Sequence, residues 1–343
     1  MANPERLTIV GGGSWGTTLA AMAAGAGRNV TLLVRDDETA RRLRHDRRNA
    51  RYLPELVLPD ALAIDSDPAA CASAAVIVLA VPTAAMRATG GALRPFVGDA
   101  VVVSAAKGLE RGTLLRMSAV IEQALDGAAP VCALSGPNLA GEIASGKPAA
   151  SVVAGVDPAA IATARGFLQR PEFRIYASRD LVGVEIGGSL KNVIAIAAGI
   201  ADGFDVGDNA KAALLTRGLA EIARLGVALG ADPLTFAGLA GLGDLVATCA
   251  SPRSRNRTVG LGLARGERLD AIAAALGQVA EGIETTRAAV ELGRRLGVEA
   301  PIAEQLHEVM FAGKPPAAAI AALLARDPTD EVQGLSRGAN KAD

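Results

Sequence analysis

The sequence predicts two domains: an α/β domain built on a doubly wound parallel sheet, followed by an all-helical domain. In the first half of the chain, short and continuously apolar runs alternate with helix-like segments, as expected of strands buried on both faces of a parallel sheet. Beyond about residue 180, long Ala-, Leu- and Ile-rich segments with helical spacing dominate. A length of 343 residues also fits about two domains of ordinary size.

The individual elements follow from these patterns in chain order. The expected strands are the apolar runs 7–11, 30–34, 75–81, 100–106, 131–134 and 151–155. Crossover helices are expected over 14–24 and 113–125, and the helices of the second domain over 181–201, 209–229, 232–240, 269–275, 283–297 and 301–312. These limits predict an α/β domain over 1–180, a helical domain over 181–335 and a polar, flexible tail over 336–343.

The composition argues against several classes of protein. Lys and Arg number 35 against 36 Asp and Glu, whereas a nucleic-acid-binding surface usually shows a basic excess. The three cysteines are widely spaced and form no CxxC pair, which favours a reducing compartment over a disulfide framework. Because His45 and His307 are the only histidines, a histidine-rich metal site or a Ser-His-Asp triad is disfavoured. Lys, Asp or Glu must therefore carry any acid–base chemistry.

The sequence also bears on location. No apolar run approaches the ~18 residues of a membrane span, and the N-terminus lacks the basic start and longer apolar stretch of a signal peptide. We therefore expect a cytoplasmic protein with no membrane, nucleic-acid or metal partner.

A glycine-rich turn follows the first predicted strand. Gly11, Gly13 and Gly16 form a GxGxxG pattern that also contains Ser14 and Trp15, and an Ala-rich helix follows. In this pattern the first glycine permits a tight turn, the second lets a pyrophosphate approach the backbone, and the third lets helix and strand pack closely. The free N–H groups of the helix N-terminus then face the anion. The turn therefore predicts a Rossmann domain that binds a dinucleotide.

Arg35 and Asp36 come directly after the second predicted strand. NAD sites usually carry an acid here, which accepts from the ribose 2′-hydroxyl, whereas a guanidinium can pair with the 2′-phosphate of NADP. Arg35 thus favours NADP unless it is an ordinary surface arginine, and Asp36 leaves NAD open. We interpret the arginine-rich segment 41–51 that follows as a solvated helix face.

Polar groups also follow two later strands. Lys107 follows the run 100–106, and Gly136 and Asn138 follow the run 131–134. Ligands of doubly wound sheets lie at the carboxyl ends of the strands, so Lys107 is placed to reach a cofactor or a phosphorylated substrate. The backbone N–H groups of the turn at 135–138 can hold an anion.

Lys191 is the most unusual polar residue, since with Asn192 it interrupts an otherwise apolar predicted helix. Burying a lysine is costly unless it is paired or its pKa falls. Gly187 and Gly188 lie one turn earlier and are expected to clear space beside the lysine side chain. We therefore expect Lys191 to act as an acid or base, the alternative being an edge lysine that reaches solvent past the small residues.

Two further groups lie in the helical half. Asp244 stands in an apolar segment, either as a helix cap or as a charged partner for Lys191. Ser254, Arg255 and Asn256 place polar groups within one turn, where they can grip a phosphate or form a basic surface patch. Glu281 follows on a predicted loop.

The chain closely resembles bacterial NAD(P)-dependent glycerol-3-phosphate dehydrogenases in the motifs GGGSWGT, AAKGLE, SGPN, GGSLKNVIAIAAGIADG, GLAGLGDLVATC, SRNR and VAEGIETT. The similarity runs over nearly the whole chain. It implies NADPH- or NADH-dependent reduction of dihydroxyacetone phosphate to sn-glycerol 3-phosphate, which supplies phospholipid synthesis. It also implies a helical domain like that of 6-phosphogluconate dehydrogenases and, with the base rate for oligomers, a homodimer.

The resemblance implies the site residues as well. Cofactor contacts fall on Gly11, Gly13, Ser14, Trp15, Gly16, Arg35, Lys107, Ala140, Arg255, Val279 and Glu281. Substrate contacts fall on Lys107, Gly136, Asn138, Lys191, Asp244, Ser254, Arg255 and Asn256. Lys191 would be the acid or base and Asp244 its electrostatic partner. Asn138 departs from the Thr or Ser usual in the family, which affects the detail of that contact.

Two other functions remain open at this point. One is a related dehydrogenase, such as a 3-hydroxyacid dehydrogenase whose substrate lacks phosphate; the donors at 254–256 argue against it. The other is a nucleotide-sensing regulator that has lost its chemistry, against which Lys191 and Asp244 argue.

Overall fold

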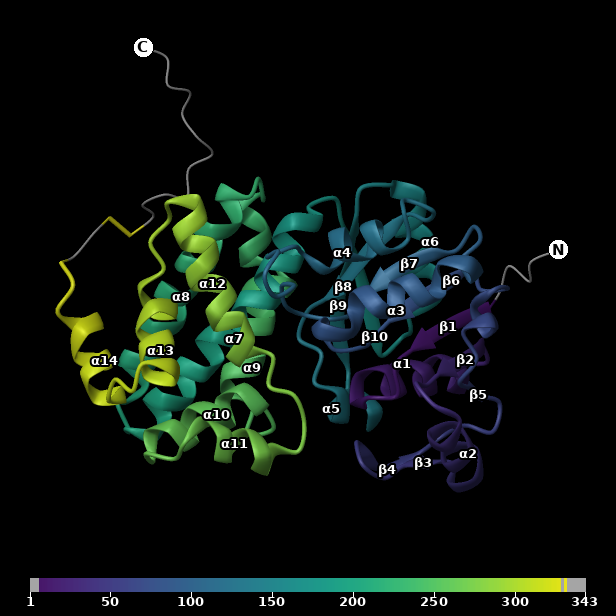
Figure 1. Ribbon diagram of the computed structural model, residues 1–343, viewed down its shortest axis with the longest axis horizontal. Coiled ribbons are helices and arrows are strands. Elements are labelled where there is room, and N and C mark those ends of the chain that lie inside the picture. Colours follow the sequence, from purple (N-terminus) through teal and green to yellow (C-terminus); the bar gives the residue numbers. More distant parts are fainter. Residues whose placement is uncertain (1–5, 328–329, 332–343) are drawn as a thin grey trace, which may run out of the picture. The chain divides into compact units, whose positions relative to one another are not determined.

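The computed structural model describes residues 6–327 and 330–331. The chain divides into two compact units (Figure 1). The first comprises Met1–Ala106 and Leu115–Leu181, and the second comprises Lys107–Leu114 and Val182–Asp343. The expected tail over 336–343 lies outside the described residues.

The first unit is built on an eight-stranded sheet among the described residues, with strand order β10-β9-β8-β7-β6-β1-β2-β5. Its strands are β1 (Arg6–Val10), β2 (Asn29–Leu33), β5 (Ala63–Asp65), β6 (Val76–Leu79), β7 (Val101–Ser104), β8 (Val131–Ser135), β9 (Ala149–Gly155) and β10 (Phe173–Ser178). A separate hairpin pairs β3 (Arg48–Asn49) with β4 (Leu53–Val57). The six strands expected from apolar runs are all present; β5, β10 and the hairpin were not predicted.

The expectation of a wholly parallel sheet is wrong at one pair. β8 and β9 run antiparallel, whereas the neighbouring pairs β7–β8 and β9–β10 are parallel. The connection between β8 and β9 holds only the short helix α5 (Ala140–Ala144), so the chain turns back along β8. The connection to β10 contains the longer crossover helix α6 (Pro158–Leu168), which returns the chain in a parallel direction.

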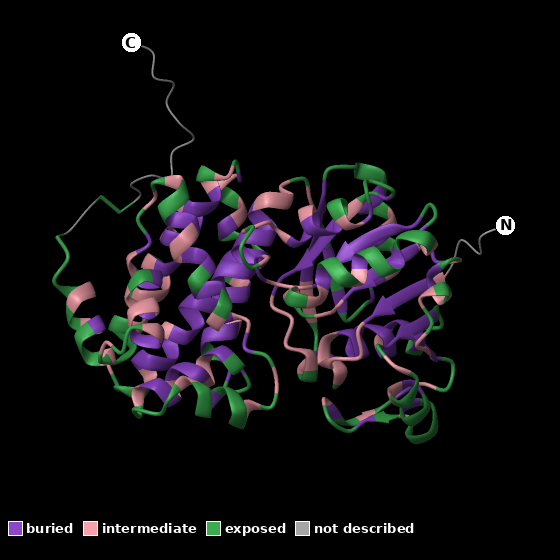
Figure 2. Ribbon diagram, viewed as in Figure 1, coloured by how far each residue is buried: buried purple, intermediate pink, exposed green. Residues whose placement is uncertain are grey.

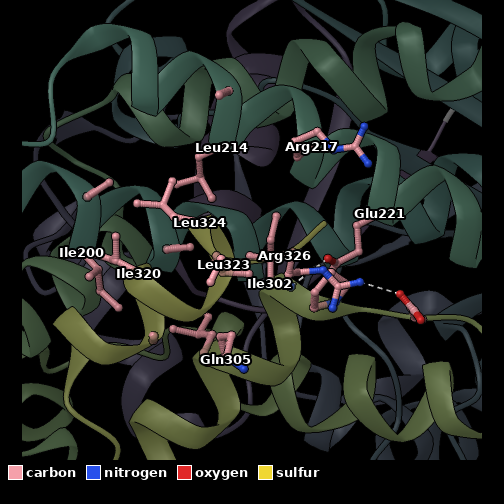
Figure 3. Close-up of a pocket in the computed structure, with 18 of the residues that line it drawn as sticks. Ile200, Leu214, Arg217, Glu221, Ile302, Gln305, Ile320, Leu323, Leu324 and Arg326 are labelled. Atoms are coloured by element: carbon pink, nitrogen blue, oxygen red, sulfur yellow. Dashed lines mark hydrogen bonds and ion pairs between the residues drawn. The ribbon is translucent and has the colours of Figure 1, made fainter. Parts of the chain in front are cut away.

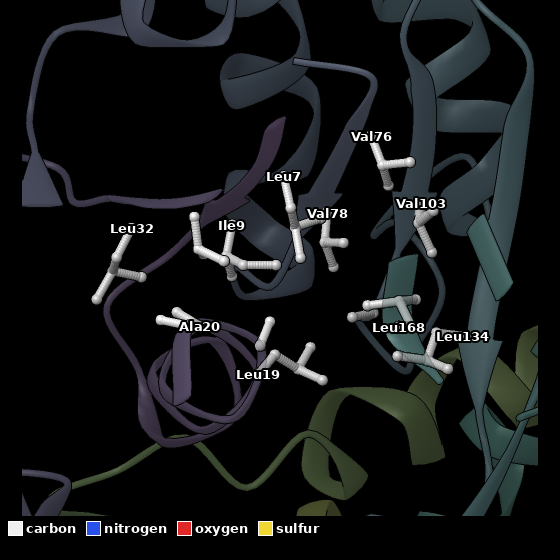
Figure 4. Close-up of a cluster of buried hydrophobic side chains, with 14 of the residues drawn as sticks. Leu7, Ile9, Leu19, Ala20, Leu32, Val76, Val78, Val103, Leu134 and Leu168 are labelled. Carbon is white, nitrogen blue, oxygen red and sulfur yellow. The ribbon is translucent and has the colours of Figure 1, made fainter. Parts of the chain in front are cut away.

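Helices cover both faces of this sheet, which explains why its central strands are continuously apolar. They are α1 (Ser14–Gly25), α2 (Asp37–Asp46), α3 (Met86–Leu93), α4 (Met117–Ala124), α5 and α6. On one face, Leu19 and Ala20 of α1 pack with Ile9, Leu32 and Val78 of the sheet (Figure 4). A second buried cluster unites strand residues with α3 and α4.

Two predicted helical segments of the first half are shorter than expected. The segment 113–125 becomes helical only at Met117, because Leu114 has a φ of 61° that a right-handed helix does not allow. The segment 41–51 is not one solvated helix face. Helix α2 ends at Asp46, Arg47 adopts a left-handed conformation, and Asn49 is buried in the β3–β4 hairpin.

The second unit is helical in its described part. Its helices are α7 (Leu181–Gly203), α8 (Asp208–Ala228), α9 (Asp244–Ala250), α10 (Arg255–Ala264), α11 (Leu269–Leu276), α12 (Gly282–Leu296), α13 (Pro301–Phe311) and α14 (Pro316–Leu324). α9, α10 and α14 were not predicted. The expected helix over 232–240 is instead a 3-10 helix (Pro233–Ala237) followed by a π-helical turn (Leu239–Gly243).

Helix α7 is the central element of the second unit. It is long and apolar enough to cross a membrane by length and composition, so the expectation that no segment approaches that length is wrong. In the fold, 83% of its most apolar window is buried, and Figure 2 shows the helix in the buried colour along most of its length. Its apolar residues form the core of the unit with α8, α12 and α13. The helix is therefore a core helix of this unit.

Candidate functional site

The glycine turn of the first unit connects β1 to α1. A Cβ atom at Gly11 would lie 2.5 Å from the Ala80 carbonyl oxygen, and one at Gly16 would lie 2.0 Å from the Gly11 carbonyl oxygen. Gly11 also has a φ of 119°, a conformation that favours glycine. A Cβ at Gly13, by contrast, would meet nothing within 4 Å. The first and third glycines thus permit close packing, while the space beside the second is left open for a ligand.

Ser14 and Trp15 begin helix α1 directly after this turn. The Trp15 ring packs edge-on against Phe173, with ring centroids 6.1 Å apart. Thr18, one turn later, donates from its hydroxyl to the Ala140 carbonyl oxygen at 3.3 Å. Ala140 of α5 is thereby held beside the start of α1.

Arg35 and Asp36 lie just beyond the end of β2. The Arg35 side chain is 86% exposed, and its Nε atom lies 2.9 Å from Asp36 Oδ2. Asp36 Oδ1 accepts from the Thr39 backbone N–H, which caps α2. This hydrogen bond is the main cause that lowers the pKa of Asp36 to about 2. Both carboxylate oxygens of Asp36 therefore have partners in their own segment, whereas the Arg35 guanidinium extends into solvent.

Gly136 and Asn138 follow β8. Gly136 has a φ of 138°, and a Cβ there would lie 3.0 Å from the Ser151 Cα atom. Asn138 Oδ1 accepts from the Ser151 hydroxyl. The Asn138 Nδ2 atom is buried and has no hydrogen-bond partner among the described residues. The hydrogen bond from Ser151 thus fixes the orientation of the Asn138 amide. The Nδ2 group of that amide is left without an acceptor among the described residues.

Two lysines share one aspartate in the second unit. Lys191 Nζ lies 2.8 Å from Asp244 Oδ1, and Lys107 Nζ lies 2.5 Å from Asp244 Oδ2. Lys191 Nζ also donates to the Thr248 hydroxyl, which in turn lies 3.2 Å from Asp244 Oδ1. The Lys191 and Asp244 side chains are only 7% and 2% exposed. We call Lys107, Lys191, Asp244 and Thr248 the lysine cluster.

Backbone packing brings Asp244 to Lys191. Asp244 begins helix α9 immediately after the π-helical turn Leu239–Gly243. A Cβ at Gly187 would lie 3.0 Å from the Ala240 carbonyl oxygen, so this glycine lets the π-helical turn approach α7 closely. The sequence predicted that Gly187 clears space for the Lys191 side chain itself. The structure shows an indirect role instead. The glycine brings the carboxylate close to the lysine.

Burial and neighbouring charges shift the pKa of one member of the lysine cluster. Desolvation lowers the pKa of Lys107 to about 8, with the Lys191 charge acting in the same direction. The Asp244 carboxylate opposes this shift. Lys107 is therefore a cation that begins to lose its proton near neutral pH.

Residues 254–256 lie at the start of helix α10, where Ser254 caps the helix and Asn256 links it to other helices. The Ser254 side chain accepts from the Arg257 backbone N–H as a helix cap. Asn256 is buried, and its Nδ2 atom donates to Asn192 Oδ1 at 2.8 Å. Its Oδ1 atom accepts from the Gly282 backbone N–H at 3.0 Å. Asn256 therefore joins α7, α10 and α12 through both ends of its amide.

The remaining residues predicted for the site are exposed or half-buried in the second unit. Arg255 is exposed at the first position of α10, and Val279 is 51% exposed. Glu281 precedes α12, and its carbonyl oxygen accepts from the Thr285 hydroxyl at 2.7 Å. The hydrogen bond to Gly282 places Asn256 beside the beginning of α12. Ser254 and Asn256, described above, are by contrast buried.

Sequence patterns did not identify two residues of these networks. Thr248 lies one helical turn after Asp244, a spacing that places both on one face of α9. Asn192 directly follows Lys191, and the sequence shows it only as a second polar residue in an apolar helix. The buried amide of Asn192 positions Asn256, which the sequence alone could not show because 64 residues separate them.

A large cavity of about 1370 Å³ also lies within the second unit, between α7, α8, α13 and α14. Figure 3 shows apolar side chains such as Ile200, Leu214 and Ile320 at one end and Arg217, Glu221 and Arg326 at the other. No residue predicted for the site is among the described residues that line it. The cavity is therefore distinct from the lysine cluster.

Models of two protein families match the two parts of the chain. The N-terminal model of NAD-dependent glycerol-3-phosphate dehydrogenase matches residues 6–161, and the C-terminal model matches residues 180–321. The chain is 46% identical to glycerol-3-phosphate dehydrogenase (NAD(P)+) of Moorella thermoacetica over 332 residues, which is 96% of this chain and 98% of that protein. It is 48% identical to the protein of the same name from Frankia casuarinae over 331 residues, 95% of this chain and 98% of that one.

Solved structures agree with the sequence relatives. The fold matches glycerol-3-phosphate dehydrogenase of Coxiella burnetii with a TM-score of 0.89 at 35% identity, covering 94% of this chain and 99% of that one. A ketopantoate reductase of Ralstonia eutropha shares the fold, with a TM-score of 0.58 at 16% identity over 92% of this chain and 99% of that one. On the sequence matches, this chain belongs to the NAD-dependent glycerol-3-phosphate dehydrogenase family.

Proposed function

We propose that this chain catalyses the reversible, NAD(P)H-dependent reduction of dihydroxyacetone phosphate to sn-glycerol 3-phosphate, which supplies phospholipid synthesis. The observation that carries the proposal is the lysine cluster, in which a buried carboxylate holds two lysines together in a member of this family. A carbonyl reduction needs a proton donor and a positive charge beside the oxygen that becomes an alkoxide. The cluster supplies both.

The glycine turn fits a dinucleotide. The open space beside Gly13 and the start of α1 suit a pyrophosphate, whose negative charge the helix N-terminus favours. In this proposal the exposed Arg35 pairs with the 2′-phosphate of NADPH, and Asp36 leaves binding of NADH open. When bound, the dinucleotide supplies the hydride. Gly11, Ser14, Trp15, Gly16, Lys107, Ala140, Arg255, Val279 and Glu281 complete the proposed cofactor set.

In this proposal Lys191 is the catalytic acid. Its ammonium donates a proton to the C2 oxygen during reduction, and the neutral amine takes a proton back in the reverse direction. Asp244 holds the ammonium and balances its charge, while Thr248 fixes the direction of the Nζ atom. The Lys107 ammonium adds positive charge beside the same oxygen. Burial of the cluster strengthens these electrostatic effects, because water screens them less.

In this proposal, the residues at the start of α10 bind the substrate phosphate. Arg255 offers paired guanidinium donors, and Asn256 offers the second hydrogen of its Nδ2 group, the first being donated to Asn192. Ser254 lies beside them. Gly136 and Asn138 of the first unit complete the proposed substrate set. The unused Nδ2 donor of Asn138 supports this assignment, since a buried donor without an acceptor is costly and a ligand oxygen would satisfy it.

A steady-state assay with three substrates tests the proposal. Oxidation of NADPH is followed by its absorbance with dihydroxyacetone phosphate, with dihydroxyacetone and with a 3-oxo acid. We expect turnover with the phosphate ester and little with the other two. Efficient turnover of the 3-oxo acid would instead identify a hydroxyacid dehydrogenase. Binding of NADPH without any turnover would favour a nucleotide sensor.

Two broader properties belong to the same proposal. We infer that the enzyme works in the cytoplasm, because its three cysteines are free and buried and its long apolar helix is a core element. A homodimer is the expected assembly, as for most soluble oligomers. Light scattering of the purified protein measures the assembly directly.

A further inference from the structure

Asn49 fastens the glycine turn of the first unit from a separate segment of the chain. Its Nδ2 atom donates to the Gly12 carbonyl oxygen at 2.9 Å and to the Thr17 hydroxyl oxygen at 2.8 Å. Asn49 is 4% exposed and Thr17 is fully buried. The two N–H bonds of one buried amide therefore reach both sides of the turn, one in the loop and one in the first helical turn of α1.

The bond to Gly12 determines the direction of a neighbouring donor. The Gly12 carbonyl and the Gly13 N–H belong to one planar peptide unit, and the described chain contains no cis peptide bond. In a trans peptide the C=O and N–H bonds point in opposite directions. Because Asn49 holds the carbonyl oxygen toward itself, it turns the Gly13 N–H toward the other side of the loop.

Asn49 can act in this way because its own segment is anchored at several points. Its carbonyl oxygen accepts from the Tyr52 backbone N–H at 3.0 Å, and Asn49 pairs with Leu53 in the β3–β4 hairpin. The Arg47 carbonyl oxygen accepts from the Leu58 N–H at 2.8 Å, and the Arg47 guanidinium donates to the Leu62 carbonyl oxygen at 3.1 Å. The hairpin is thus closed across its base, and the amide projects from a fixed support.

We propose that Asn49 is a positioning residue for dinucleotide binding, which it serves by holding the Gly12–Gly13 peptide in the orientation that presents the Gly13 N–H to the pyrophosphate. This inference rests on the cofactor site of the proposed function. The pyrophosphate is common to NADPH and NADH, so Asn49 affects both cofactors equally. In the proposed function it is Arg35 that distinguishes between them, through the 2′-phosphate.

Asn49→Asp tests the proposal, because it keeps the side-chain size and removes both donors. A carboxylate would face the Gly12 carbonyl oxygen and release or turn the peptide. Direct fluorescence titration without substrate should show the Kd of NADPH and of NADH rising by the same factor, roughly tenfold. The kcat at saturating cofactor should stay within about twofold of the wild type, because Asn49 contacts no reacting group.

Arg48→Ala is the matched control. Arg48 lies in the same hairpin, is exposed and donates to the Pro54 carbonyl oxygen at 3.1 Å rather than to the glycine turn. This variant should leave both dissociation constants unchanged. Thr17→Val provides a second, independent arm, since it removes one of the two acceptors of Asn49 with little change in shape. Thr17→Val should raise both dissociation constants by the same factor, smaller than in Asn49→Asp. If Asn49→Asp does not fold, the dissociation constants of Thr17→Val test the proposal.

Three results would overturn the proposal: unchanged dissociation constants in folded Asn49→Asp, an effect on only one cofactor, or a loss of kcat at saturation as large as the change in Kd. Failure of the proposed function looks different. A wild-type protein that binds NADPH without reducing dihydroxyacetone phosphate contradicts the reaction and leaves the binding test of Asn49 intact.

Discussion

Lys191 Nζ lies 2.8 Å from Asp244 Oδ1, and both side chains are almost completely buried. An ion pair at this depth is a weak source of stability, because removing both charges from water costs about as much as their attraction returns. Asp244 also holds Lys107 through its other oxygen. One carboxylate between two lysines leaves a net positive charge, which is suited to an oxygen that gains negative charge during a reaction.

The first prediction concerns Asp244→Asn. Removing the carboxylate removes the attraction that raises the pKa of Lys107, so this pKa should fall below its present value of about 8. In the wild type we expect the Kd of dihydroxyacetone phosphate to increase as pH rises through about 8, because Lys107 loses its charge. In Asp244→Asn the increase should begin at lower pH. Calorimetric titration from pH 6 to 9 measures both curves, and coincident curves would refute the coupling.

The second prediction concerns the choice of cofactor. Arg35→Ala should raise the KM for NADPH roughly tenfold or more, because a charge-assisted contact to the 2′-phosphate is lost. The KM for NADH should change little, since NADH has no 2′-phosphate. Arg42→Ala, an exposed arginine on the neighbouring helix α2, is the control and should affect neither. An equal change in the KM for NADPH and for NADH in Arg35→Ala would show that Arg35 does not bind the 2′-phosphate.

The third prediction concerns the substrate phosphate. Arg255→Ala should raise the KM for dihydroxyacetone phosphate and lower kcat if phosphate binding positions the carbonyl. The ratio of kcat/KM for dihydroxyacetone phosphate to that for dihydroxyacetone should therefore fall toward one. Arg253→Ala, an exposed arginine two residues earlier, is the control. If wild type and Arg255→Ala use the two substrates in the same ratio, another residue binds the phosphate.

The fourth prediction concerns stability. Glu221 of α8 accepts from the Ile302 and Ala303 backbone N–H groups at the start of α13, and burial raises its pKa to about 7. The folded state therefore holds this proton up to higher pH than the unfolded state, in which the glutamate carboxyl has its ordinary pKa of 4.5. The contribution of Glu221 to stability should fall as pH rises from about 4.5 to 7, by roughly 1–3 kcal/mol.

Glu221→Gln isolates this effect, because glutamine does not titrate. Denaturant unfolding of wild type and variant at several pH values should give a stability difference that shifts in favour of the variant as pH increases. A difference that stays constant between pH 4.5 and 7 would mean that Glu221 has an ordinary pKa in the folded state. Glu221 also lines the large cavity. The unfolding measurements therefore use protein with no ligand bound.

Periodicity and motif spacing predicted the parts of this molecule that depend on local sequence. Runs such as 76–79 and 101–104 are buried on both faces, so their apolar character alone identifies them as strands. The apolar helix around Lys191 left two possibilities, a buried lysine or an edge lysine that reaches solvent, and the structure shows it buried. The antiparallel β9 was missed because an apolar strand carries no mark of its direction, which the length of the preceding connection decides.

Long-range partners were harder to predict. Asn49 lay within a run of arginines that resembles a solvated helix, and only the hairpin shows that its amide is buried against the glycine turn. Thr248 and Asn192 are ordinary polar residues in helices until the fold brings them to Lys191 and Asn256. Such contacts join segments far apart in sequence, so no pattern within a short window contains them.

The most direct test of the central claim is the kinetics of Lys191→Ala together with its binding of NADPH. We predict a folded enzyme that binds NADPH with near wild-type affinity and loses kcat for dihydroxyacetone phosphate by about 10²- to 10⁴-fold, the usual contribution of a positioned acid. Thermal unfolding and fluorescence titration establish folding and binding. A folded Lys191→Ala enzyme that binds NADPH and keeps near-normal kcat would show that Lys107 or water supplies the proton, and would contradict the account.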